Sequence, residues 1–158
     1  MHHADPAEAF DGAGAQARKT CFVLLPNGTA TLPPRDGESA ADGDAPTVDF
    51  DEIYQTIIEP AVEAAGLMPI RSGHINRSGL VQKEMVEQII KADVALIDVS
   101  CANAHVYYQL GVRHTVRRAG TVVMRHERSG ENADIGSTRV ITYGDTHADR
   151  IEQARTVI

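Results

Sequence analysis

Short apolar runs alternate with stretches of helical spacing along the chain, and this alternation predicts an α/β domain. The runs lie at 20–25, 67–71, 93–99, 121–125 and 139–143. A short continuous apolar run is typical of a strand buried on both faces of a sheet. Apolar residues recur at helical spacing at 50–65, 80–91 and 105–118. We therefore predict a doubly wound, mainly parallel sheet of about five strands, with helices on both faces.

Capping residues and prolines mark the limits of these elements. Asp49 is a favourable N-cap for the helix at 50–65, and Pro60 inside that helix should kink or divide it. Pro69 favours an edge position for the second strand, because proline has no N–H to donate within a central strand. A further, weak helix is predicted at 148–157.

The chain length and the uneven composition suggest one domain with two irregular segments. We predict a single α/β domain over residues 20–158, because 158 residues suit one hydrophobic core. Residues 1–19 lack the apolar core of a signal peptide and are predicted to be a disordered leader. Residues 26–47 are rich in Pro, Gly, Asp and Ala, which predicts a long loop without a core of its own.

Charge and cysteine content narrow the classes of function. The formal net charge is −7, which argues against general nucleic-acid binding because phosphate neutralisation requires a basic surface. No apolar run approaches the length of a membrane-spanning helix. Cys21 and Cys101 have neither metal-site spacing nor the pattern of a disulfide framework. We expect a reduced, cytoplasmic protein without a metal or another cofactor.

Polar residues follow the apolar run at 93–99, at the position where parallel sheets bind their ligands. Asp98 provides a carboxylate that can hold a ribose hydroxyl, and Ser100 lies two residues further on. Asp and Ser are also the usual residues for capping a helix and for hydrogen-bonding the backbone of a loop. Two interpretations stay open, a ligand site at the strand end or local backbone capping.

The predicted helix at 105–118 begins with polar and aromatic residues. Asn103 precedes the helix and is a candidate both for its N-cap and for a ligand contact. We expect one of the adjacent residues Tyr107 and Tyr108 in the core and the other against a base or sugar. Packing of both tyrosines is the alternative.

Three arginines are candidate ligand contacts. Arg113 and Arg117 lie one turn apart on the same helix face, where they suit bidentate binding of a phosphate or form a solvated basic face. Arg71 ends the second predicted strand, again at a carboxyl end. The sequence contains no glycine-rich dinucleotide motif, no P-loop and no zinc-type Cys/His spacing.

Three blocks of the sequence resemble a known family. They read "CFVLLP", "VDFDEIYQTIIEPAVEAAGLMPIR" and "IIKADVALIDVSCANAHVYYQLGVRHTVRRAGTVVM" and cover most of 21–124. Their pattern is similar to the nucleoside 2-deoxyribosyltransferase-like fold family, close to bacterial relatives of the TRAFs-binding domain of apoptosis signal-regulating kinases. The resemblance implies an α/β fold with a nucleoside or nucleotide site, and a homo-oligomer in which a neighbouring subunit completes that site.

The resemblance also assigns roles to individual residues. In the enzymes of this fold, a glutamate on the helix after the strand attacks the sugar C1′ and displaces the base. By position, this nucleophile falls on Gln109, while Asp98 lies at the strand end and Asn103 at a base or sugar contact. A neutral amide is a very poor nucleophile but still hydrogen-bonds a sugar hydroxyl. We therefore expect Asp98 and Gln109 to share a crevice that grips a ligand without cleaving it.

Three functions are compatible with these features. The first is a nucleotide-binding signalling or sensor domain in bacterial stress or defence, with Gln109 at the catalytic position. The second is an N-glycosidase or deoxyribosyltransferase acting on a nucleoside, a nucleotide or NAD, and inactivated by a Glu-to-Gln substitution. The third is a protein-interaction scaffold without a ligand, which requires a filled crevice at the strand end. We favour the first.

Overall fold

The structure, a computed structural model, describes residues 18–34, 45–75, 81–101, 103–130, 135 and 138–144. The predicted helix at 148–157 and residues 1–17 of the predicted leader lie outside these ranges.

Five parallel strands form the central sheet in the order β4-β1-β5-β6-β7. The strands are β1 (Thr20–Leu24), β4 (Met68–Arg71), β5 (Val94–Asp98), β6 (Thr121–His126) and β7 (Val140–Tyr143). All five predicted apolar runs are therefore strands. The strand with Pro69 lies at an edge of the sheet, as predicted, where a missing N–H leaves no neighbour unpaired.

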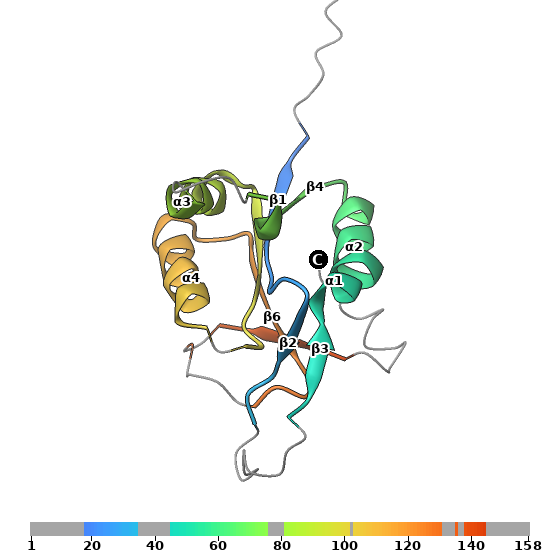
Figure 1. The fold of residues 1–158 in the computed structure, drawn as a ribbon. Coiled ribbons are helices and arrows are strands. Elements are labelled where there is room, and N and C mark those ends of the chain that lie inside the picture. The colour runs from blue at the N-terminus through green and yellow to red at the C-terminus, as the bar shows by residue number, and fades with distance from the viewer. Residues whose placement is uncertain are drawn as a thin grey trace, which may run out of the picture.

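Helices cover both faces of this sheet, which confirms the doubly wound α/β class (Figure 1). One face packs against α1 (Phe50–Ile53) and α2 (Glu59–Ala64), and the other against α3 (Val81–Lys91) and α4 (Ala104–Val116). Side chains of β1 alternate between the two cores. Cys21 and Val23 belong to the α1 and α2 side, whereas Phe22 and Leu24 belong to the α3 and α4 side.

The helix predicted at 50–65 is capped and divided as expected. The Asp49 carboxylate accepts the backbone N–H groups of Asp51 and Glu52 at 2.9 and 3.2 Å. A π-helical turn, Tyr54–Ile58, separates α1 from α2. The division comes directly before Pro60, which has no N–H to donate to the preceding turn.

A β-hairpin occupies part of the predicted loop at 26–47, so that prediction is wrong in this segment. Strands β2 (Thr29–Thr31) and β3 (Thr47–Asp49) pair antiparallel. Leu32 and Val48, next to and within these strands, are buried in the core on the α1 side. Leu32 and Val48 therefore contribute hydrophobic side chains to this core.

The chain connections create a switch point between β1 and β5. From β1 the chain crosses to β4 past α1 and α2, and then returns across β1 to β5 past α3 on the opposite face. The loops after β1 and β5 therefore leave the sheet in opposite directions. In open α/β sheets this arrangement opens a crevice at the carboxyl ends of the strands. None of the helices in the described ranges has the length and apolar character needed to cross a membrane.

Candidate functional site

A hollow of about 510 Å³ lies at the carboxyl ends of β1, β4 and β5, at the switch point. Its polar side chains come from the loops after these strands and from the start of α4. The residues that line it are Leu24, Leu25, Pro26, Asn27, Ala30, Ser72, Gly73, Met85, Asp98, Cys101, Asn103, His105 and Val106. The volume and the mixed lining match the usual small-molecule site, which is a mainly apolar pocket with a few polar groups.

Asp98 is fixed at the inner wall of the hollow. Its Oδ2 accepts a hydrogen bond from the Tyr143 hydroxyl at 2.6 Å, and its Oδ1 accepts one from the Ser100 N–H at 2.8 Å. The side chain is 1% exposed. Burial raises the pKa of the Asp98 carboxyl, although the hydrogen bonds from Tyr143 and Ser100 oppose this shift. The same burial, together with the Asp98 charge, raises the pKa of the Tyr143 hydroxyl well above 10.

Ser100 is a structural residue of the loop that forms the hollow. It is fully buried, and its Oγ accepts a hydrogen bond from the His126 N–H at 2.7 Å. Its carbonyl oxygen accepts one from the Ser129 hydroxyl at 2.6 Å. Ser100 therefore ties the end of β5 to the end of β6, which supports the local interpretation rather than a ligand contact.

Asn103 and His105 bring the start of α4 to the hollow. The Asn103 Oδ1 accepts the N–H of His105 at 2.9 Å, so Asn103 is the N-cap of α4 as well as a lining residue. The two interpretations of Asn103 are thus compatible, because the cap uses the oxygen and leaves the amide nitrogen available. His105 forms part of the wall, and its Nε2 lies 2.7 Å from Gln109 Nε2.

Gln109 does not line the hollow and does not share it with Asp98. It is fully buried behind His105 and Met85, which do line it, and its Nε2 lies 4.0 Å from the Met85 Sδ. Asp98 follows Leu96 in the strand alternation and contacts Tyr143 on the α1 side of the sheet, whereas α4 covers the other face. The expected direct juxtaposition of Asp98 and Gln109 is therefore absent, and His105 stands between Gln109 and the hollow.

The two tyrosines of α4 lie outside the hollow. Tyr108 is 63% exposed, and Tyr107 packs half-buried against the core on the α3 and α4 side. The Tyr107 hydroxyl is buried without a hydrogen-bond partner among the described residues. Neither tyrosine takes the expected position against a base or sugar.

Arg71 stabilises the loop after β1, which forms part of the hollow. Its side chain is 7% exposed. The guanidinium forms an ion pair with Asp51, donates to the Pro26 carbonyl at 3.1 Å and lies over the Tyr54 ring at 4.8 Å. Asp51 also accepts the Gly28 N–H at 3.0 Å. Arg71 thus fixes the loop after β1, and its charge is already paired with a carboxylate.

Arg113 lies at the opposite end of the sheet, so its predicted role as a phosphate contact is wrong. It is fully buried and donates to four backbone carbonyls, at 2.7 to 3.1 Å. These belong to Ile89, Ala92, Asp93 and Gly120. Asp93 and Gly120 directly precede β5 and β6, so these contacts place Arg113 at the amino ends of the strands. Arg117 is exposed, but because Arg113 is buried the two arginines do not form the solvated basic face of the alternative interpretation either.

Several residues of the hollow were not among the sequence candidates, namely Asn27, Ser72, Met85, Cys101 and His105. The sequence could have indicated His105, because it lies in the first turn of the helix that follows Asp98 and four residues before Gln109. Burial raises the pKa of the Cys101 thiol to about 11, which disfavours the thiolate that nucleophilic attack requires. A Cβ at Gly73 would lie 2.0 Å from the Asn27 Oδ1, so any larger residue there would displace the Asn27 side chain in the hollow.

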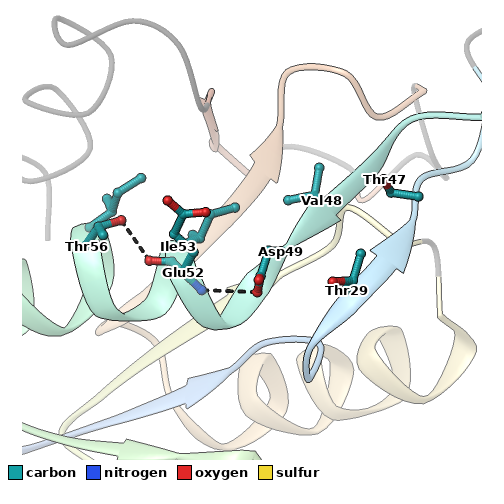
Figure 2. A pocket seen from close by; sticks show the side chains of 8 residues that line it. Thr29, Thr47, Val48, Asp49, Glu52, Ile53 and Thr56 are labelled. Atoms are coloured by element: carbon teal, nitrogen blue, oxygen red, sulfur yellow. Dashed lines mark hydrogen bonds between the residues drawn. The ribbon is translucent and has the colours of Figure 1, made fainter.

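A second hollow, of about 360 Å³, lies between the β2–β3 hairpin and the start of α1 (Figure 2). Its acidic side chains are Asp49 and Glu52. The Asp49 carboxylate accepts the Glu52 N–H, and the Thr56 hydroxyl donates to the Glu52 carbonyl at 2.7 Å. These groups satisfy the helix backbone, so we place the candidate site in the larger hollow.

No family model matches the chain, and a search of the curated proteins finds no similar protein. Within the described ranges, no three His, Cys, Asp or Glu side chains come close enough to hold a metal ion. Function is therefore inferred from the geometry of the hollow and from the family resemblance of the sequence.

Proposed function

We propose that the chain is a nucleotide- or nucleoside-binding domain of the sensor or signalling type, with the deoxyribosyltransferase-like fold and no nucleophile at the ligand. The observation that carries the proposal is the hollow of about 510 Å³ at the β1 and β5 switch point. Ligands of open α/β sheets bind at this place. A role in bacterial stress or defence belongs to the same proposal and rests on the resemblance alone.

The lining offers both kinds of surface that a nucleoside requires. Leu25, Met85 and Val106 supply apolar area for the faces of a base. Asn27, Asn103 and Ser72 supply amide and hydroxyl groups for sugar hydroxyls and base edges.

The charges around the hollow are compatible with a neutral or anionic ligand. Burial raises the pKa of Asp98 and so favours its neutral form, which reduces repulsion of a phosphate. The amino end of the 13-residue helix α4 reaches the hollow at Asn103 and attracts negative charge.

A ligand panel tests the proposal. Purine and pyrimidine nucleosides, their 5′-monophosphates and NAD are added to the full chain, and the melting temperature and the heat of binding are measured. A ligand at a hundred times its dissociation constant stabilises by about 2.7 kcal/mol, which corresponds to a rise of roughly 5–10 °C for a domain of this size. The ligand should be recovered unchanged by chromatography. No shift with any member of the panel contradicts the proposal.

His105→Ala should weaken binding of the active ligand at least tenfold, because it removes one wall of the hollow and its ring nitrogen. His114→Ala is the matched control, since it removes an exposed histidine of the same helix that does not line the hollow. Isothermal titration calorimetry gives both affinities. Equal losses of affinity in the two variants would show that the ligand does not bind at the start of α4.

The second candidate is a trapped N-glycosidase, and one observation keeps it open. Gln109 contacts two lining residues, His105 and Met85, so a rearrangement of His105 would bring position 109 to the ligand. Gln109→Glu should then release free base from a nucleoside, nucleotide or NAD, which chromatography detects. If Gln109→Glu binds the ligand and no base appears over hours, the enzyme interpretation fails and the binding interpretation stands.

The third candidate, a scaffold without a ligand, has less support. It requires a filled crevice at the strand end, whereas the space beside Asp98 is a hollow of about 510 Å³.

A further inference from the structure

Gln109 and His105 form a side-chain pair on α4. They are four residues apart on α4, so their side chains lie on the same face of the helix. Gln109 Nε2 lies 2.7 Å from His105 Nε2, and an amide nitrogen only donates hydrogen bonds. His105 Nε2 is therefore the acceptor. The proton of the neutral ring must then reside on Nδ1.

The Nδ1–H group is available to a ligand. The His105 ring lines the hollow, and no described residue hydrogen-bonds its Nδ1. The Gln109 contact holds the ring at Nε2, and Asn103 accepts the His105 backbone N–H at 2.9 Å. A donor fixed in this way selects for an acceptor on the ligand.

A glutamate at position 109 would reverse this polarity. An ionised carboxylate only accepts, so it would favour a proton on Nε2 and leave Nδ1 without one. The amide at position 109 therefore changes the chemistry of the site without touching the ligand itself.

We propose that Gln109 is a positioning residue that holds His105 as the Nδ1–H tautomer, and that the ligand presents an acceptor oxygen to this N–H. The inference rests on the proposed nucleotide-binding function and specifies the ligand further. Two oxygens of a nucleotide have the required chemistry, the oxo group of a base such as hypoxanthine and a phosphate oxygen.

The tautomer is measured first, on the ligand-free protein. Long-range ¹H–¹⁵N correlation spectra at mildly alkaline pH show which ring nitrogen of His105 carries the proton. We expect Nδ1–H in the wild type and in the control Gln55→Glu, which places a new carboxylate at an exposed position on the other side of the sheet. We expect Nε2–H in Gln109→Glu. Gln109→Met lacks the donor and adds no charge, so it should lose the Nδ1–H preference. This variant keeps the test decisive if the buried carboxylate of Gln109→Glu prevents folding.

Ligand selectivity is measured second, with inosine, adenosine and their 5′-monophosphates. If the acceptor is a base oxo group, wild-type protein should bind inosine about tenfold more tightly than adenosine, whose amino group is a donor at the same position. Gln109→Glu should abolish or reverse this preference. If the acceptor is a phosphate, the monophosphates should gain about tenfold over both nucleosides, and Gln109→Glu or Gln109→Met should remove the gain.

The outcomes separate the two proposals. An Nε2–H tautomer in the ligand-free wild type overturns the positioning role of Gln109, whatever the ligands do. The expected tautomer with no binding by any panel member overturns the proposed function and the acceptor, but leaves the tautomer assignment standing. Binding with selectivity that neither Gln109 variant alters overturns the acceptor contact at His105.

Discussion

Arg113→Met should destabilise the fold by about 4 kcal/mol, within the range for breaking a buried, charge-assisted hydrogen-bond network. The guanidinium donates to the carbonyls of Ile89 and Ala92 in and just after the last turn of α3, where helix carbonyls lack partners within the helix. It also donates to Asp93 and Gly120 at the amino ends of two strands. Methionine fills similar volume but donates nothing, so the buried carbonyls of Ile89 and Ala92 lose this donor, whereas the Gly120 carbonyl keeps the N–H of Ala95.

Urea unfolding followed by circular dichroism measures the change in the free energy of unfolding. Arg117→Met is the matched control, because Arg117 donates to the carbonyls of Ile90 and Lys91 at 3.2 and 3.3 Å from an exposed position. Water replaces an exposed donor, so the control should lose less than about 1 kcal/mol. Arg113→Lys has fewer donors and should give an intermediate loss of stability, which can be measured if Arg113→Met does not fold. Equal, small losses in both methionine variants would contradict the stabilising role of the hydrogen bonds from Arg113.

Arg113 also shows how the sequence misled a site prediction. Its spacing with Arg117 indicated a paired phosphate site, and spacing alone does not tell which end of the sheet a residue reaches. The βαβ connection contains that information. A helix that begins at the carboxyl end of β5 must end near the amino ends of the strands, so residues late in α4 lie away from the ligand end. Asn103, at the start of the same helix, does line the hollow.

The strands were predictable from short apolar runs, and all five runs became strands of one sheet. The central strands β1 and β5 are buried along almost their whole length, whereas the edge strands β4 and β7 are only partly buried. The β2–β3 hairpin was not predictable in this way. Its strands have three residues each, too few for a period-two pattern, and Leu32 stands among Pro, Gly and Thr. Only its burial against the core reveals that it belongs to the fold.

The position of the hollow was predictable, but the hydrogen-bond partners of its residues were not. A carboxylate at the end of β5 pointed to the hollow, and Asp98 is there. Its hydrogen-bond partner Tyr143 lies 45 residues away on β7, which no local pattern connects. The separation of Gln109 from the hollow by His105 likewise depends on side-chain packing between α3 and α4.

Asp98→Asn should make the fold less sensitive to pH and at least as stable as the wild type at pH 7. The asparagine oxygen can accept the Ser100 N–H, and its amide nitrogen can donate to the Tyr143 oxygen, so both contacts persist. Asp98→Ala has neither group. It should lose about 3 kcal/mol, because the Tyr143 hydroxyl and the Ser100 N–H are buried.

The direction of the pH effect follows from the pKa of Asp98, which burial raises above 3.8 in the folded protein. Below about pH 4 the carboxyl is protonated in both the folded and the unfolded chain, so its contribution to stability is fully present. Between the unfolded and the folded pKa, the unfolded chain releases the proton first. Wild-type stability therefore falls as pH rises through this window, by at most about 1.4 kcal/mol per pH unit.

Urea unfolding of the wild type and Asp98→Asn at pH 4, 5.5 and 7 tests this sign. The free energy of unfolding of Asp98→Asn relative to the wild type should increase with pH, and the increase should level off once Asp98 is ionised in the folded protein. Other titrating groups act equally on both proteins and cancel in the difference. A difference that decreases with pH would mean that the hydrogen bonds from Tyr143 and Ser100 outweigh burial. Asp98 would then face the hollow as a permanent anion, and a neutral ligand would be favoured over a phosphate.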